Sequence, residues 1–209
     1  YLGAANPSRF GKKGLGAADE VTSGGLPSSV ASSKVFNPDP GDDLAMTDYR
    51  PHEHGGPVHL INVCLNQTRD PRGGLFNQDR RGQMLTVAPG GAVRVGRGPW
   101  QPAQTEAGES PLTLGSWIAI SGAAVAPGLG QMTRGGLAAL VTFAGLRLGY
   151  WWRNPACVGV TPRWWTAAKT RGLLREVFAN FGGAEGRDWF LSDGGHFENT
   201  AAYALLAEQ

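Results

Sequence analysis

The sequence is short of charge and has no excess of basic residues. Charged residues make up 17% of the 209-residue chain and hydrophobic residues 41%, whereas an ordinary soluble domain has about a quarter charged residues. This balance is typical of a chain that folds around a core and excludes a wholly disordered one. The formal net charge is only +2, and no basic stripe is interleaved with aromatic residues, so nucleic acid is not an expected partner.

Cysteine and long hydrophobic runs are also scarce. The two cysteines, Cys64 and Cys157, could pair, which the sequence does not decide; we expect two buried thiols, because unpaired cysteine is among the most buried residue types. Residues 135–152 are nearly apolar and close to membrane-spanning length, but Arg147 interrupts them. We therefore expect a buried helix here rather than a membrane span.

Strong metal signatures are missing. The run His52-Glu53-His54, with His59 nearby, suggests a metal site, but no Cys-x-x-Cys or His-Glu-x-x-His pattern accompanies it. The acidic residues near it lack the alternating oxygen ligands and closing glutamate of a calcium loop: Asp39, Asp42 and Asp43. We expect polar loops at both places and predict neither a metal nor a cofactor.

The chain has no initiator methionine and no secretory signal, and it stops within a stretch that reads as a helix. We therefore expect a fragment of a longer polypeptide. Residues 1–56 lack apolar periodicity and are rich in Gly, Ser and Pro, which indicates an extended loop or linker. Residues 57–209 carry the periodic segments of an α/β domain.

The elements expected in that domain alternate between strands and helices. The predicted strands cover residues 58–65, a hairpin of 84–88 and 92–95, and 189–192. The predicted helices cover residues 134–152, 161–181 and about 200 to the end, with Thr161 and Pro162 starting the second and Gly182-Gly183 stopping it. Residues 114–125 fit either a helix or a buried strand and turn. This order favours a layered α/β fold with flanking helices.

The segment 189–199 carries the strongest functional signal. An apolar strand ends at Asp193, and Gly194 and Gly195 follow before a helix. A carboxylate on such a turn sits where α/β enzymes keep their chemistry, at the carboxyl ends of the strands. It could orient or deprotonate a nucleophile, or it could simply cap its own turn, as Asp-Gly sequences often do.

No serine lies in the Gly-x-Ser-x-Gly pattern of a nucleophile elbow. Ser23 is followed by two glycines, but Pro27 stands where an elbow needs a helix. Ser121 has an apolar approach and small residues after it but lacks the flanking glycines. Both are weak nucleophile candidates, and a flexible linker and a packed turn are the alternative interpretations.

Most tryptophans lie in the second half of the chain, with arginine residues near several of them. We expect most of these tryptophans to pack in the core or at its rim, although a lipid-facing surface stays open. The residues are Trp151, Trp152, Trp164, Trp165 and Trp189, with Arg147, Arg153 and Arg163.

Three blocks of sequence together resemble the patatin-like phospholipase family, and specifically its large bacterial members. They are HLINVCLNQT (59–68) with NQDRRG (77–82), LGSWIAISGAA (114–124) with LRLGYWW (146–152), and LSDGGHFEN (191–199) with Tyr203 and Leu205. The resemblance covers residues from about 57 to the end, and its third block is the most specific.

The resemblance implies a cytosolic-phospholipase-like α/β fold and a lipid acyl hydrolase with a Ser-Asp dyad acting at a membrane surface. Asp193 matches the family's Asp-Gly-Gly acid, which serves as base for the serine. The neighbouring residues would shape the turn or contact substrate: Gly194, Gly195, His196, Phe197, Glu198 and Asn199. The compartment stays open between the cytoplasm and a membrane.

The family's serine and its glycine-rich oxyanion loop lie upstream of the first block, and residues 1–56 match neither. We therefore expect the carboxyl-terminal part of an incomplete domain, inactive alone because nucleophile, base and oxyanion donors must converge. One alternative is a non-catalytic module that binds lipid or a protein. The least favoured is a metal-dependent hydrolase using His52, His54 and Asp193.

Overall fold

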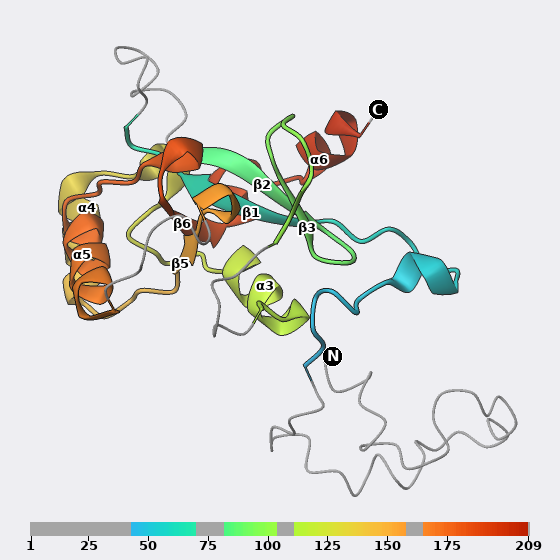
Figure 1. Cartoon of the computed structure of the whole chain (residues 1–209). Coiled ribbons are helices and arrows are strands. Elements are labelled where there is room, and N and C mark those ends of the chain that lie inside the picture. The colour runs from blue at the N-terminus through green and yellow to red at the C-terminus, as the bar shows by residue number, and fades with distance from the viewer. Residues whose placement is uncertain (1–42, 70–81, 104–110, 158–164, 209) are drawn as a thin grey trace, which may run out of the picture.

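A single antiparallel sheet forms the centre of the protein (Figure 1). The computed structural model describes residues 43–69, 82–103, 111–157 and 165–208. Six strands lie in the order β4-β3-β2-β1-β6-β5, and every neighbouring pair is antiparallel. Their bounds are β1 Ile61–Asn66, β2 Gly82–Ala88, β3 Ala92–Val95, β4 Gln101–Pro102, β5 Tyr150–Arg153 and β6 Asp188–Asp193. The predicted α/β class is confirmed, with this antiparallel sheet as its framework.

The central pair, β1 and β6, joins segments that lie far apart in the chain. Cys64 pairs with Ser192 and Val63 with Asp193. Five of the six residues of β1 are buried, which explains its nearly continuous apolar sequence. The predicted strand at 58–65 is confirmed, but it begins at Ile61, three residues later than expected.

The predicted hairpin is also confirmed. Ala88 pairs with Ala92, and the connection between β2 and β3 passes through Gly90 and Gly91 at φ of 79° and 77°. Residues that carry a side chain rarely adopt this left-handed backbone conformation, so glycine suits both positions.

Within the described ranges four α-helices flank the sheet, and Figure 1 shows α4 and α5 side by side. They are α3 Leu114–Ser121, α4 Gly135–Phe143, α5 Trp165–Val177 and α6 Ala202–Ala207. Residues 114–125, left open between helix and strand, begin as a helix because Thr113 caps it: its Oγ1 accepts a hydrogen bond of 3.1 Å from the Ser116 N–H. Helix α3 packs against β1 and β6.

Alternate residues of β6 enter two separate clusters of buried side chains. Trp189 and Leu191 belong to the larger cluster with Trp117 and Trp152, whereas Phe190 stacks on Phe181, with ring centroids 4.7 Å apart, in the smaller one. Both faces of this strand are therefore covered. The expected core packing of the tryptophans is confirmed for Trp152 and Trp189; Trp164 and Arg163 lie outside the described residues.

The predicted helix at 134–152 is confirmed over residues 135–143 and wrong beyond them. Helix α4 ends at Phe143, Gly145 turns the chain at φ 74°, and Tyr150–Arg153 instead forms β5 on the edge of β6. A Cβ on Gly149 would lie 2.3 Å from Cζ of Phe190, so the approach to this edge requires glycine. Nor is α4 fully buried, since Phe143 is 80% exposed, and no described helix is long and apolar enough to cross a membrane.

The other predicted boundaries shift by a few residues. Helix α5 ends at Val177, earlier than the expected stop at Gly182-Gly183, because Ala179 takes a left-handed φ of 47°. The predicted cap at Thr161 and Pro162 lies outside the described residues. The last helix begins at Ala202 rather than Thr200.

Cys64 and Cys157 are unpaired. Cys64 is buried as expected, but Cys157 is only partly buried, so the prediction of two buried thiols is wrong for the second. Before residue 57 the structure describes residues 43–56, which include the 3-10 helix η3 (Pro51–His54) and the buried Met46, a member of the larger cluster.

Candidate functional site

Asp193 ends β6 and caps the turn that follows it. Its Oδ1 accepts a hydrogen bond of 2.7 Å from the Gly195 N–H, at the start of the 3-10 helix η8 (Gly194–His196). The turn-capping interpretation is thus realised. Among the described residues, no hydrogen bond or ion pair reaches the other carboxylate oxygen, Oδ2. One oxygen therefore orients the group and the other stays available for chemistry.

The two glycines let the backbone of the turn lie close to neighbouring atoms. A Cβ on Gly194 would lie 2.5 Å from the Asn62 carbonyl oxygen, and one on Gly195 would lie 2.8 Å from Oδ1 of Asn199. Gly194 therefore lets the turn lie directly on β1. The carboxyl end of β6 does not lie beside the carboxyl ends of its neighbours, because β1 and β5 both run antiparallel to it.

An open cavity of about 450 Å³ lies at this end of β6. It brings together Asp193 and Ser121 with Gly194, Gly195 and Asn199, whereas His196 does not line it. The remaining lining residues are His59, Leu60, Ile61, Asn62, Ile118, Glu198 and Ala201. Asn62 and Ile118 were not expected; only the pairing of β1 with β6 and the packing of α3 on them place these residues here.

Ser121 lines the cavity but does not contact Asp193. It is the last residue of α3, and its hydroxyl donates a hydrogen bond of 2.7 Å to the Asn62 carbonyl oxygen. An activated serine instead sits on a turn from strand to helix with its hydroxyl exposed to a base. Ser121 as observed is a helix-end residue bound to a strand, and Ser23 lies outside the described residues.

Glu198 is the second carboxylate of the cavity, and its oxygens are occupied. Oε1 accepts a hydrogen bond of 2.6 Å from the Thr200 N–H and another from the Thr200 hydroxyl, while Oε2 accepts one of 3.3 Å from the Tyr203 N–H. The hydrogen bonds from Thr200 lower the pKa of Glu198 below its usual value. Glu198 therefore caps the start of α6, whereas Asp193 keeps one carboxylate oxygen without a hydrogen bond among the described residues.

His196 belongs to a hydrogen-bonded network behind the site. Its Nε2 lies 3.1 Å from the Ala124 carbonyl oxygen, which can only accept, so Nε2 carries the proton and Nδ1 accepts from the Ser192 hydroxyl at 3.0 Å. That hydroxyl accepts in turn from Nδ2 of Asn66 at 2.8 Å.

Burial lowers the pKa of His196, against the opposing effects of Asp193 and the Ala124 bond. A neutral imidazole therefore ties the turn to the loop after α3. His196 was expected either to contact substrate or to shape the turn; it does not line the cavity, and its hydrogen bonds lie within the turn and its surroundings.

Other candidate groups are weaker. Burial raises the pKa of Cys64 to about 12, so its thiol is protonated and unreactive at neutral pH. His52 and His54 are exposed on η3, and His59 Nδ1 is bound to the Tyr49 hydroxyl at 2.9 Å. No three metal-ligating side chains meet within the ranges that the structure describes, so the metal hypothesis on His52, His54 and Asp193 is wrong.

Comparison of the chain with family models, with curated proteins and with solved structures gave no match in any of the three. The residues of the cavity are therefore the guide to function. They offer a held carboxylate with one available oxygen, an apolar wall, two side-chain amides and the Ser121 hydroxyl.

Proposed function

We propose that this chain supplies the aspartate base of a patatin-like lipid acyl hydrolase. The observation that carries the proposal is Asp193 itself. It lines a cavity of about 450 Å³, the Gly195 N–H holds its Oδ1 at 2.7 Å, and Oδ2 has no partner among the described residues. A general base needs this combination of fixed orientation and an available lone pair.

The cavity suits an acyl ester in size and in lining. Ligand pockets commonly enclose about 300–1,000 Å³ and combine apolar walls with a few polar groups. Leu60, Ile61 and Ile118 supply apolar surface here, while Asn62 and Asn199 supply polar groups near the acid. An acyl chain could lie along the first set with its ester near the second.

In the proposed reaction a serine hydroxyl attacks the ester carbonyl and its proton passes to Oδ2 of Asp193. Collapse of the tetrahedral intermediate breaks the bond to the alcohol, which leaves with that proton. Water then attacks the acyl-enzyme, again losing its proton to Asp193, and the serine recovers a proton as the fatty acid departs. The oxyanion would be held by backbone N–H groups of a glycine-rich loop, as the family resemblance implies.

The proposal favours a serine from outside the described residues over Ser121. The Ser121 hydroxyl would have to leave the Asn62 carbonyl, 2.7 Å away, and α3 gives it no elbow geometry. The family pattern places the serine upstream of the first block, so the whole gene product is the right material for a test.

The test is ester hydrolysis by the whole gene product and its Asp193→Asn variant. Loss of a general base costs about 10²–10⁴-fold in kcat, and we expect a loss in that range. The matched control is Asp48→Asn, which removes the same charge from an exposed aspartate. This variant should retain full activity. Ser121→Ala should also retain activity; its inactivation would make Ser121 the nucleophile, and an active Asp193→Asn enzyme would refute the role of Asp193.

A second candidate is a non-catalytic module of the same fold that holds an acyl ligand in this cavity. Two observations favour it: Ser121 is bound to Asn62 and Asp193 caps its own turn. A whole gene product that binds a fatty acid without cleaving esters, and loses that binding on Ile118→Asn, would establish this candidate. Ester turnover dependent on Asp193 would exclude it.

A further inference from the structure

A second, smaller cavity lies between β5 and α5, at the opposite end of β6 from Asp193. Its volume is about 30 Å³, and charged side chains dominate its lining: Arg153, Arg171, Arg175, Arg187 and Asp188, with Trp151, Trp152 and Gly172. Asp188 is the one carboxylate among these described lining residues. Four guanidinium groups thus share a small space with a single negative charge.

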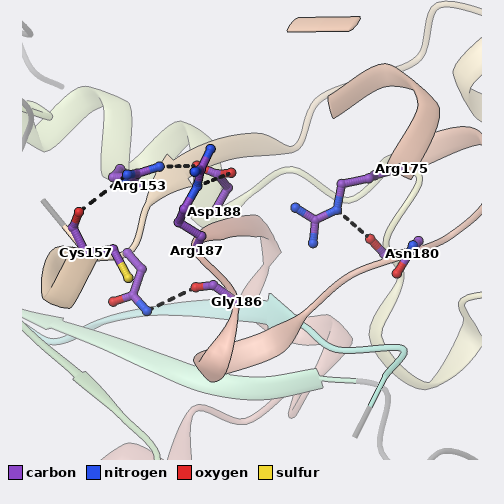
Figure 2. A network of polar contacts seen from close by, with 8 residues as sticks. Arg153, Cys157, Arg175, Asn180, Gly186, Arg187 and Asp188 are labelled. Atoms are coloured by element: carbon purple, nitrogen blue, oxygen red, sulfur yellow. Dashed lines mark hydrogen bonds and ion pairs between the residues drawn. The ribbon is translucent and has the colours of Figure 1, made fainter. Parts of the chain in front are cut away.

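Two of the arginines already use that carboxylate. Nη1 of Arg153 lies 3.3 Å from Oδ1 of Asp188, and Nε of Arg187 lies 3.8 Å from its Oδ2. Figure 2 shows these contacts together with the bond from Nη2 of Arg153 to the Cys157 carbonyl oxygen at 3.4 Å. Asp188 is therefore shared as an ion-pair partner by Arg153 and Arg187.

The other two arginines come from one face of α5, since positions 171 and 175 are one helical turn apart. Nε of Arg175 donates to the Asn180 carbonyl oxygen at 3.1 Å, and its guanidinium lies over the Trp151 ring, 4.9 Å from the centroid. These two contacts fix the plane of the group. In Figure 2 the guanidinium group of Arg175 points from α5 toward the side where Asp188 lies.

The nearby buried acid Glu176 does not compensate these charges. Its carboxylate accepts hydrogen bonds from Nη2 of Arg147 at 2.8 Å and from Nε1 of Trp151 at 2.7 Å. Burial lowers the pKa of Arg175, and the positive charge of Arg171 lowers it further, against the effect of Asp188. Among the described residues, neither Asp188 nor Glu176 forms an ion pair with Arg171 or Arg175, so the positive charges of these two side chains are not paired with an acid there.

We propose that this cavity binds one phosphate group. Guanidinium groups match phosphate oxygens in charge and in paired hydrogen-bond geometry, and Arg171 and Arg175 present N–H donors to one small space. A water molecule needs on the order of 10–15 Å³ of cavity volume. The volume of about 30 Å³ here therefore admits a small anion and no acyl chain. Gly172 keeps that space, since a Cβ there would lie 3.2 Å from Nε1 of Trp151.

This phosphate is not the one of a lipid cleaved at Asp193. Asp188 and Asp193 are the two ends of β6, separated by roughly 16 Å at about 3.3 Å per residue, whereas the phosphate of a glycerophospholipid is only a few bonds from its ester. The cavity therefore takes a second phosphate, either a soluble one or a headgroup of the lipid surface. The proposal does not depend on ester hydrolysis.

The first arm of the test is titration with inorganic phosphate at constant ionic strength, read by calorimetry and by the fluorescence of the tryptophan under Arg175. We expect saturable binding at one site per chain. Arg171→Gln and Arg175→Gln should each weaken it about tenfold or more, and Arg171→Lys should recover part of the loss. Arg97→Gln removes an exposed arginine elsewhere and should have no effect.

The second arm is flotation with vesicles of phosphatidylcholine alone or mixed with phosphatidic acid. Binding to the mixed vesicles that Arg171→Gln weakens, without saturable binding of inorganic phosphate, assigns the site to a lipid headgroup; the reverse result assigns it to a soluble phosphate. If neither probe distinguishes the wild type from Arg171→Gln, the proposal is wrong. Because Arg171 is exposed, that variant is expected to fold even if Arg175→Gln does not.

Discussion

The two ends of strand β6 place the same type of residue in opposite roles. Asp188 at its start lies among arginine side chains, 3.3 Å from Arg153 and 3.8 Å from Arg187. Asp193 at its end is held by one backbone N–H and lines a cavity of about 450 Å³. Asp188 forms an ion pair with the buried Arg153, whereas Asp193 keeps one carboxylate oxygen available.

The difference arises from what each end of the strand meets. At the start, β5 and the turn before β6 bring arginines to the acid. At the end, glycines keep the turn close to β1, and no described cation forms an ion pair with Asp193. A carboxylate is thus structural or functional according to its neighbours, and the strand that carries both does not decide between them.

The largest effect on stability is expected from crowding the Asp193 end. Gly194→Ala would place a Cβ 2.5 Å from the Asn62 carbonyl oxygen, which forces the central strands apart and should cost about 3 kcal/mol of unfolding free energy. Chemical denaturation of both proteins measures this cost.

The matched control is Gly172 of α5, which lines the cavity near the Asp188 end of β6. In Gly172→Ala the new Cβ would lie 3.2 Å from Nε1 of Trp151, and the gain of about 1 kcal/mol in helix propensity offsets that crowding. We expect nearly unchanged stability with weaker phosphate binding. Equal destabilisation by the two substitutions would mean that the turn at Gly194 has no special need for close approach.

The paired substitutions Asp188→Asn and Asp193→Asn separate the two roles directly. Asp188→Asn leaves Arg153, whose side chain is 1% exposed, without its ion-pair acid, and should cost about 2 kcal/mol of unfolding free energy. Asp193→Asn keeps an oxygen for the Gly195 N–H and should cost less than about 1 kcal/mol. Denaturation midpoints measured in parallel decide the order, and a larger loss for Asp193→Asn would reverse the assignment of structural and functional acid.

Much of the Asp193 end was predictable from sequence, because its signals are local. Asp193-Gly194-Gly195 encodes the turn, and the apolar run Trp189–Leu191 before it encodes the strand. The contribution of Asn62 was not predictable, since only the register of β1 against β6, with Val63 opposite Asp193, brings it there.

The Asp188 end shows where local signals fail. The apolar stretch at 135–152 reads as one helix, but Gly145 and Gly149 end it and Tyr150–Arg153 pairs with β6. That pairing is a tertiary contact, so helical periodicity gave no sign of it. The cluster of arginines around Asp188 depends on the same pairing: Arg153 and Asp188 are directly opposite across the two strands.

The smallest effect is expected from His196, the residue that links the Asp193 turn to the loop after α3. Burial makes its pKa lower in the folded protein than the usual value near 6.5, so the unfolded chain binds more protons at mildly acidic pH. The stability that the neutral imidazole contributes is therefore fully present above about pH 6.5 and is lost as the pH falls through the lowered folded pKa.

His196→Gln tests this by keeping a donor for the Ala124 carbonyl oxygen while removing the titration. Melting temperatures of the two proteins at pH 7.5 and pH 5 should differ less at the acidic value, because only the wild type loses the contribution of His196 on acidification. An identical difference at both pH values would show that His196 does not titrate differently in the folded and unfolded chains. Since the Asp188 end contains arginines and no histidine among its described lining residues, any pH dependence that this variant removes belongs to the Asp193 end alone.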